Sequence, residues 1–235
     1  MCELCPPSGP SRRDMFKLGA GAVAAATLLG SLPAAAQPQN AIPPDEALKR
    51  LMDGNARYVA NAPQERDFSA SRAARAAGQA PIAAILSCAD SRVGAELAFD
   101  QSQGDIFSVR LAGNFVNDDG LASLEYATRF LGVPLIMVLG HTSCGAVDAA
   151  IKVLQDKAKL PGHLPQLIGA IKPAVELAKK RKPTNLLDEA IVENVRYNVS
   201  RLQRARPIIT DKVREGKIRV VGGVYEIATG KVQLV

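Results

Sequence analysis

Three short apolar runs are separated by stretches of helical spacing, and this alternation constrains the fold more than any other feature of the chain. The runs are PIAAILSC (residues 81–88), DIFSVRLAG (105–113) and PLIMVLGH (134–141). Continuous apolar runs of this length are typical of strands buried on both faces of a parallel sheet. Strands that alternate with helices predict an α/β fold, with a mainly parallel central sheet flanked by helices.

Helical spacing covers much of the remaining chain. Asp45 is placed to cap a helix through residues 46–59, which would form an N-terminal helical arm. The other expected helices are one within 61–81 and three over 120–132, 145–159 and 185–206.

Prolines interrupt the stretch 160–184, at positions 161, 165, 173 and 183. Since proline in a helix interior removes a hydrogen bond, only short and broken helix is expected there. The C-terminal stretch 217–235 predicts a strand, a turn at Thr229–Gly230 and a final short strand.

Composition indicates an ordinary globular chain. Its 235 residues are 47% hydrophobic and 22% charged, which suits one large domain with a core. The formal charge is +6, and the lysines and arginines are interleaved with acidic residues along the chain. Aromatic residues make up only 4%. Neither feature favours nucleic-acid binding, which uses concentrated basic patches or aromatic stacking.

The first 36 residues have the three-part pattern of an export signal. Arg12 and Arg13 precede the uncharged run LGAGAVAAATLLGSLPAAA, and Ala34–Ala36 offer a cleavage site. The arginine pair resembles a twin-arginine signal, although Met15 stands where phenylalanine is more usual. We expect export, to the periplasm by the twin-arginine route, with no stable membrane span after cleavage. An uncleaved membrane anchor remains the alternative.

Removal of the signal would leave a short leader and a single domain. Residues 1–36 would be lost, 37–44 would form a flexible leader, and 45–235 would form a single domain. Cys2 and Cys5 would leave with the signal, so only Cys88 and Cys144 of the four cysteines would remain. An oxidising destination would ordinarily favour a disulfide between such a pair.

Side chains that can bind a metal or act in catalysis lie at or just after the ends of two of the apolar runs. Cys88 ends the first run, His141 ends the third, and Cys144 comes three residues later. Because ligands of open α/β sheets bind at the carboxyl ends of the strands, these side chains are expected at one edge. Two thiolates and one imidazole match a zinc site with an open fourth position. The second histidine, His163, lies in a proline-bracketed loop and is expected to be a surface or structural residue, since motif spacing offers it no partner ligand.

Asp90 and Arg92 lie just after Cys88. In an extended segment, residues two apart face the same way, so the carboxylate and the guanidinium can form a bidentate pair. Other readings of the two cysteines stay open at this point: a disulfide, a cysteine nucleophile with His141 as base, or inert buried thiols.

The motifs CADSR (88–92) and HTSCGAV (141–147) resemble the β-class carbonic anhydrases. The resemblance extends over roughly residues 45–235. It implies zinc, one ion per subunit, held by Cys88, His141 and Cys144. Asp90 and Arg92 would be the catalytic pair, with Asp90 as a fourth zinc ligand in a closed state. The implied substrate-pocket residues are Gln79, Phe107, Tyr126 and Gly145, of which Phe107 and Tyr126 would act across a dimer interface.

The resemblance also implies the reaction, which is reversible hydration of carbon dioxide to bicarbonate and a proton by hydroxide on zinc. It implies a homodimer or a higher homo-oligomer as well. Ile85 stands where one branch of the family has a tryptophan that helps to bind an inhibitory bicarbonate, so that regulatory site is not expected. The alternatives are a zinc hydrolase of carbon disulfide or carbonyl sulfide, and a non-catalytic protein that binds zinc or bicarbonate.

Overall fold

A five-stranded sheet forms the centre of the computed structural model, which describes residues 42–70 and 72–235. The strands are β1 (Ala83–Ser87), β2 (Ile106–Arg110), β3 (Leu135–His141), β4 (Arg219–Tyr225) and β5 (Val232–Leu234). Their order across the sheet is β2-β1-β3-β4-β5. Every neighbouring pair is parallel except the last, β4 with β5. The expected α/β fold with a mainly parallel sheet is confirmed.

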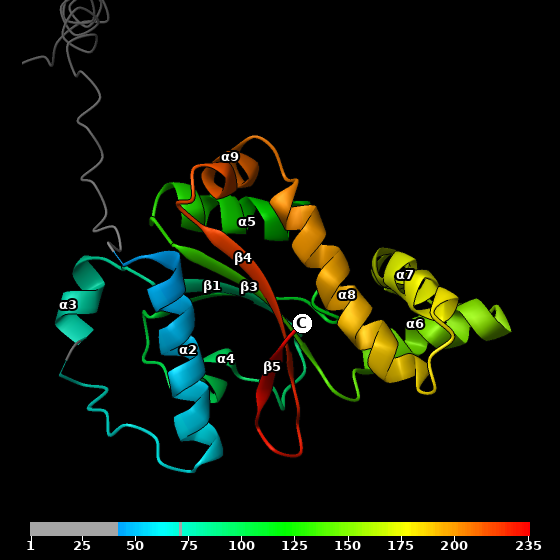
Figure 1. Cartoon of the computed structure of the whole chain (residues 1–235), viewed down its shortest axis with the longest axis horizontal. Helices are drawn as coiled ribbons and strands as arrows, with labels where there is room; N and C mark the ends of the chain where they lie inside the picture. Colours follow the sequence, from blue (N-terminus) through cyan, green and yellow to red (C-terminus); the bar gives the residue numbers. More distant parts are fainter. Residues whose placement is uncertain (1–41, 71) are drawn as a thin grey trace, which may run out of the picture. The chain divides into compact units, whose positions relative to one another are not determined.

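Helices cover both faces of this sheet (Figure 1). They are α2 (Pro44–Val59), α3 (Arg72–Ala77), α4 (Ala95–Ala98), α5 (Asp118–Arg129), α6 (Gly145–Asp156), α7 (Leu164–Lys180), α8 (Leu186–Gln203) and α9 (Ile208–Arg214). Side chains of α2 and α4 pack in one core cluster, and side chains of α5, α8 and α9 pack in a second. A third cluster joins α6, α7 and α8 to Cys88 and Cys144.

The central strands are buried because their side chains pack into core clusters on both faces of the sheet. Every residue of β1 and of β3 is buried. Ile85 belongs to the cluster under α2, whereas Leu86 belongs to the cluster under α5 and α8. Successive strand residues point to opposite faces, which explains why these runs are apolar without alternation.

The helical arm α2 docks through a buried asparagine. The Asn55 side-chain amide donates to the carbonyls of Ala98 and Gly230, at 2.8 Å each, and its oxygen accepts from the N–H of Val232 at 2.9 Å. Asp45 does not cap this helix as expected. The helix begins at Pro44, after an extended Pro43, and its N-cap residue has no side-chain hydrogen bond. Proline suits the first turn because its fixed φ matches the helix.

Helix α7 contradicts the expectation of short, broken helix over 160–184. It runs unbroken for 17 residues, with Pro165 in its first turn and Pro173 inside. Pro165 removes an N–H that would have had no helical partner. Pro173 does remove a bond, but buried residues before and after it, among them Ile171 and Val175, pack the helix on its neighbours. Tertiary packing therefore outweighs the intrinsic preference.

Other boundaries lie close to those expected, and two short elements were missed. The C-terminal strand, turn and short strand are confirmed, with the turn closed by the Gly230 N–H donating to the Glu226 carbonyl at 2.8 Å. Neither α4 nor α9 was expected, because four and seven residues are too few to establish a helical period. The proposed signal, 1–36, lies outside the described residues. No helix in the described part is long and apolar enough to cross a membrane.

Candidate metal centre

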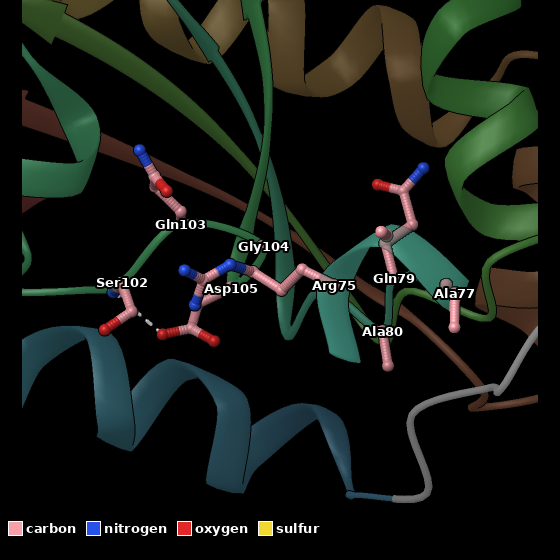
Figure 2. Close-up of a pocket in the computed structure, with 10 residues that line it drawn as sticks. Arg75, Ala77, Gln79, Ala80, Ser102, Gln103, Gly104 and Asp105 are labelled. Atoms are coloured by element: carbon pink, nitrogen blue, oxygen red, sulfur yellow. Dashed lines mark hydrogen bonds between the residues drawn. The ribbon is translucent and has the colours of Figure 1, made fainter. Parts of the chain in front are cut away.

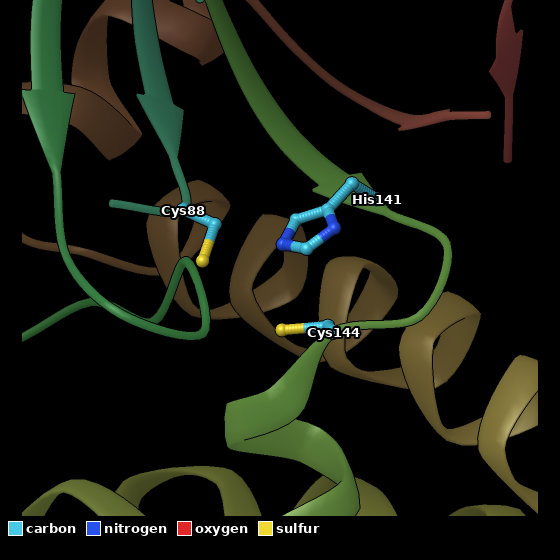
Figure 3. Close-up of side chains that lie close together, drawn as sticks. All are labelled: Cys88, His141 and Cys144. Atoms are coloured by element: carbon cyan, nitrogen blue, oxygen red, sulfur yellow. The ribbon is translucent and has the colours of Figure 1, made fainter. Parts of the chain in front are cut away.

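Two neighbouring strands bring Cys88, His141 and Cys144 to the carboxyl edge of the sheet. Cys88 directly follows β1, and His141 is the last residue of β3, which pairs with β1 in parallel. Cys144 is the N-cap residue of α6. The two sulfurs and the imidazole face a common point (Figure 3), and their donor atoms all lie within 4.8 Å of one another. The edge predicted from the sequence therefore exists, and all three residues lie on it.

A short, fixed turn carries the chain from His141 to Cys144. The N–H of Thr142 donates to the carbonyl of Tyr225 at 3.0 Å, and the Thr142 hydroxyl accepts from the N–H of Ile227 at 3.1 Å. Ser143 then takes a left-handed backbone, with φ of 56°. These restraints turn the chain within three residues, so the sulfur of Cys144 comes back toward the imidazole.

The imidazole of His141 is prepared to act as a ligand. His141 is 0% exposed, and its Nδ1 lies 2.9 Å from the Thr142 carbonyl. A carbonyl only accepts, so Nδ1 carries the hydrogen and Nε2 keeps a free lone pair. In the described structure, Nε2 has no hydrogen-bond partner although it is buried. An unpaired buried nitrogen is costly, and a metal ion on Nε2 would remove that cost.

Both cysteines are free thiols and nearly inaccessible to solvent, at 4% exposure for Cys88 and 1% for Cys144. The hydrogen bond from Cys144 lowers the pKa of Cys88, and the same bond, helped by burial, raises the pKa of Cys144. Zinc prefers thiolate and imidazole donors, so these residues fit that ion. The hypothesis of a disulfide between Cys88 and Cys144 is wrong.

Asp90 and Arg92 form the expected bidentate pair. Arg92 Nε donates to Asp90 Oδ1 at 3.0 Å, and a terminal nitrogen donates to Oδ2 at 2.8 Å. The segment is not extended, however. The N–H of Val93 donates to the Asp90 carbonyl at 3.1 Å, so the pair sits on a turn, where the Arg92 N–H also reaches Asp90 Oδ1. Asx-type turns favour aspartate for this reason.

The Asp90 carboxylate lies beside the metal-ligating cluster. Its Oδ2 is 3.8 Å from His141 Nε2. Hydrogen bonds from Arg92 hold the pKa of Asp90 well below its usual range, although partial burial opposes them. Asp90 is therefore a charged acceptor next to the point where the three donor atoms converge.

Two residues near the site were missed by sequence reasoning. Arg110 donates through Nε to the carbonyl of Cys88 at 3.1 Å, and through a terminal nitrogen to the carbonyl of Asp90 at 2.8 Å. The N–H of Gly113 donates to Cys88 Sγ at 3.2 Å. The only sequence signal for Arg110 was a charge at the end of an apolar run. A glycine N–H leaves no signal, because every residue except proline has one.

The expected pocket residues are not all brought to the cluster within one chain. Gly145 follows Cys144 directly, as the first residue of α6. Gln79 instead lines a pocket with residues 75–78, 80 and 102–105, ahead of the amino end of β1 (Figure 2). Cys88 follows the carboxyl end of the same strand, so the length of β1 separates Gln79 from it.

Phe107 and Tyr126 contact each other, with ring centroids 6.4 Å apart. Phe107 pairs with Ala84, four residues before Cys88 and so about 13 Å from it along the strand. Tyr126 is 45% exposed. Tyr126 is therefore accessible on α5, whereas Phe107 is half-buried on β2 and packs against the core cluster that includes α5. His163 is exposed at the start of α7, as expected of a surface residue.

Comparisons with known proteins identify the family of the chain. The family model described as carbonic anhydrase matches residues 83–232. Carbonic anhydrase 2 of Mycobacterium tuberculosis is 41% identical over 192 residues, which cover 81% of this chain and 92% of the relative. The carbonic anhydrase of Mycolicibacterium smegmatis is 38% identical over 81% of this chain and 93% of its own length.

Solved structures extend the agreement to the fold. The β-carbonic anhydrase CcaA is 28% identical, with a TM-score of 0.62 over 80% of this chain and 94% of its own. Two tetrameric β-carbonic anhydrases from Sordaria macrospora give a TM-score of 0.64 at 19% identity, over 96% of this chain and 98% of theirs, and so support the fold alone. With a family model that matches most of the chain and a relative at 41% identity, this protein belongs to the β-class carbonic anhydrase family.

Proposed function

We propose that Cys88, His141 and Cys144 hold the zinc ion with which this chain hydrates carbon dioxide. The observation that carries the assignment is the convergence of two sulfurs and an unpaired, buried His141 Nε2 within 4.8 Å. A structural zinc site uses four protein ligands, whereas a catalytic site uses three and leaves one position open. The ligand group found in the described chain has three members, which favours catalysis over a purely structural or binding role.

Zinc, when bound, would supply a Lewis acid that lowers the pKa of its water to about 7. The work of the chain's own residues is orientation. Asp90, ionised and 3.8 Å from Nε2, is placed to accept a hydrogen bond at the fourth position. Arg92 restrains both carboxylate oxygens of Asp90. Release of that pair would free the Asp90 carboxylate to occupy the fourth position itself, which is the closed state.

We also propose that the substrate pocket is completed by a second copy of the chain. Gly145 is beside the cluster in its own chain, whereas Gln79, Phe107 and Tyr126 lie away from it. Tyr126 is exposed on α5, and the half-buried Phe107 contacts it from the edge strand β2, so a partner could meet the two rings together. Apolar rings suit an uncharged substrate such as carbon dioxide. A homodimer or higher homo-oligomer follows from this arrangement, and the Sordaria macrospora neighbours are described as tetrameric.

Export through the twin-arginine route remains our proposal for residues 1–36. Its support is the Arg12–Arg13 pair, the uncharged run after it and the small residues at 34–36. Such export carries folded proteins, so zinc could shield Cys88 and Cys144 from oxidation on the way to the periplasm. Replacing both arginines by lysine should keep the protein in the cytoplasm, and N-terminal sequencing of the exported form should begin near Gln37. Efficient export of the lysine variant would contradict the route.

Paired histidine variants test the ligand assignment. His141→Ala should lose zinc and carbon dioxide hydration together, because it removes one of three ligands. His163→Ala removes the other histidine, which is exposed on α7, and should retain both. Zinc content measured by atomic absorption and hydration measured by stopped flow give the two readouts. A His141→Ala protein that keeps stoichiometric zinc would refute the assignment.

A further inference from the structure

A loop between β2 and α5 supplies a hydrogen bond to one sulfur of the metal centre. The N–H of Gly113 donates to Cys88 Sγ at 3.2 Å, and Cys88 is buried. A thiolate that accepts such a bond gives up part of its charge to the donor. It therefore donates less charge to a bound metal, and hydrogen bonds of this kind are known to tune metal–sulfur centres. Residues that fix the position of this loop therefore influence the charge that Cys88 can donate to the metal.

The loop has a backbone conformation that few residues adopt. Gly113 and Asn114 both have left-handed backbones, with φ of 84° and 41°. The turn is closed by the N–H of Asn114 donating to the Leu111 carbonyl at 2.8 Å. A side chain at Gly113 would meet Ile171 Cδ1 at 2.4 Å. Non-glycine residues rarely adopt a left-handed backbone unless the surroundings impose it.

Helix α8 imposes it through two fully buried asparagines. Asn194 Nδ2 donates to the Gly113 carbonyl at 2.8 Å. One turn later, Asn198 Oδ1 accepts from the N–H of Val116 at 2.9 Å. Asn198 Nδ2 in turn donates to the Asn194 carbonyl at 2.8 Å. Because i and i+4 lie on one face of a helix, the two asparagines hold the loop at Gly113, within the turn, and at Val116, just after it.

We propose that Asn194 is a positioning residue for the metal centre: by holding the Gly113 carbonyl, it aims the Gly113 N–H at Cys88 Sγ. Asn194 lies 106 positions after Cys88 in the chain and acts only through the loop. The value of this hydrogen bond follows from the two thiolates in the proposed ligand set. Two thiolates make zinc a weaker Lewis acid than neutral imidazoles do, and a hydrogen bond to one sulfur partly offsets this. The inference rests on the proposed zinc site.

Asn194→Leu tests the proposal, since leucine is similar in size and lacks the donor. Asn55→Leu is the matched control, because Asn55 is also buried and also bonds two carbonyls, but on α2 away from the cluster. Both variants are reloaded with cobalt(II) in place of zinc. Loss of the sulfur hydrogen bond should move the sulfur-to-cobalt charge-transfer band to longer wavelength in Asn194→Leu alone. Hydration by the zinc form should fall about 10- to 100-fold, again only in Asn194→Leu.

A wild-type measurement protects the test against a variant that fails to fold. In protein loaded with cadmium-113, the Gly113 amide proton should show scalar coupling to the metal through Cys88 Sγ. The absence of that coupling would overturn the proposal. An unchanged cobalt band in a folded Asn194→Leu protein, with stability lost as in Asn55→Leu, would do the same. Failure of the wild-type chain to bind cobalt or cadmium would instead refute the proposed metal site itself.

Discussion

Asp90 has to stay ionised beside the three proposed zinc ligands for as long as the fourth zinc position is open. Arg92 satisfies that requirement through two hydrogen bonds to the carboxylate, and Arg110 holds the carbonyls of Cys88 and Asp90. The carboxylate is thus fixed both by its own charge partner and by its backbone.

Asp90→Asn should keep zinc and lose most of its activity. The amide is similar in size, but it cannot act as a charged acceptor, so kcat should fall by about 10²- to 10⁴-fold. Zinc content and stopped-flow hydration measure the two effects. Asp148→Asn on α6, which breaks only the exposed pair with Lys152, is the control and should retain the wild-type rate. Full turnover by Asp90→Asn would show that the carboxylate has no part in the reaction.

Sequence reasoning could single out the candidate site residues whose chemical type suits a metal centre. Cys88, His141, Cys144 and the Asp90–Arg92 pair stand out because few other roles require those residues at that spacing. Asn194 could not be identified, because its partner is a backbone carbonyl far away in the chain. A buried asparagine that bonds backbone looks like any other polar residue of an amphipathic helix until the fold is known.

Helix α7 is continuous although it contains Pro173, contrary to the expectation of a broken helix. Pro173 has no N–H to donate to the carbonyl of Gly169, so one helical bond is missing. Pro173→Ala should restore it and raise the free energy of unfolding by about 2 kcal/mol, within the range of proline's penalty in a helix interior.

Pro165→Ala is the matched control for that change. Pro165 lies in the first turn, where an N–H has no helical partner, so its replacement should give no stabilisation. Urea unfolding of both variants measures the difference. Equal effects of the two substitutions would mean that the position of proline within α7 does not matter.

A buried carboxylate clamps the segment after α2 and makes stability depend on pH. Asp100 accepts from Arg57 at 2.6 Å and from the N–H of Gln64, and it also pairs with Arg66. Burial alone would raise the pKa of Asp100, but the hydrogen bonds from Arg57 and Arg66 outweigh burial and lower it. A lowered pKa in the folded state gives stability above the ordinary aspartate pKa of about 3.9 that is lost as pH falls.

Asp100→Asn should therefore be less stable than the wild type near pH 7, by about 2 kcal/mol for lost charged hydrogen bonds. That difference should shrink as pH falls below about 4, because the Asp100 carboxylate of the unfolded wild-type chain then takes up a proton before the folded one does. Urea unfolding of both proteins at several pH values measures the difference directly, and any acid release of zinc is common to both. A difference that is independent of pH would contradict the clamp.

The strands were predictable and the shortest helices were not, for physical reasons. β1 and β3 are buried on both faces, so nearly every residue in them is apolar and the pattern is plain. α4 and α9 span barely one or two turns. Such elements are defined by their contacts in the folded chain, and a short sequence window carries too little of that information.

The whole molecule presents an aromatic surface that one chain leaves exposed. Tyr126 contacts Phe107 on one side and Phe130 on the other, with centroids 5.3 Å apart in the second pair, and Phe130 is 57% exposed. Phe130→Asp should shift the protein toward monomer in sedimentation velocity and reduce hydration, because Gln79, Phe107 and Tyr126 would no longer reach a neighbouring site.

Leu177→Asp places the same charge on another exposed apolar residue, on α7. It should leave both the oligomeric state and the rate unchanged. A Phe130→Asp monomer with the wild-type rate would show that each chain contains a complete site, contrary to the proposed sharing of pocket residues.

The central claim is that a zinc ion on Cys88, His141 and Cys144 hydrates carbon dioxide. The most direct test is the initial rate of carbon dioxide hydration, measured by stopped flow on zinc-replete protein from about pH 6.5 to 9, around the usual pKa of zinc-bound water. The predicted result is a rate well above that of buffer, which disappears when zinc is removed and returns when it is restored. A rate equal to buffer throughout that range, with one zinc bound per chain, would contradict the claim.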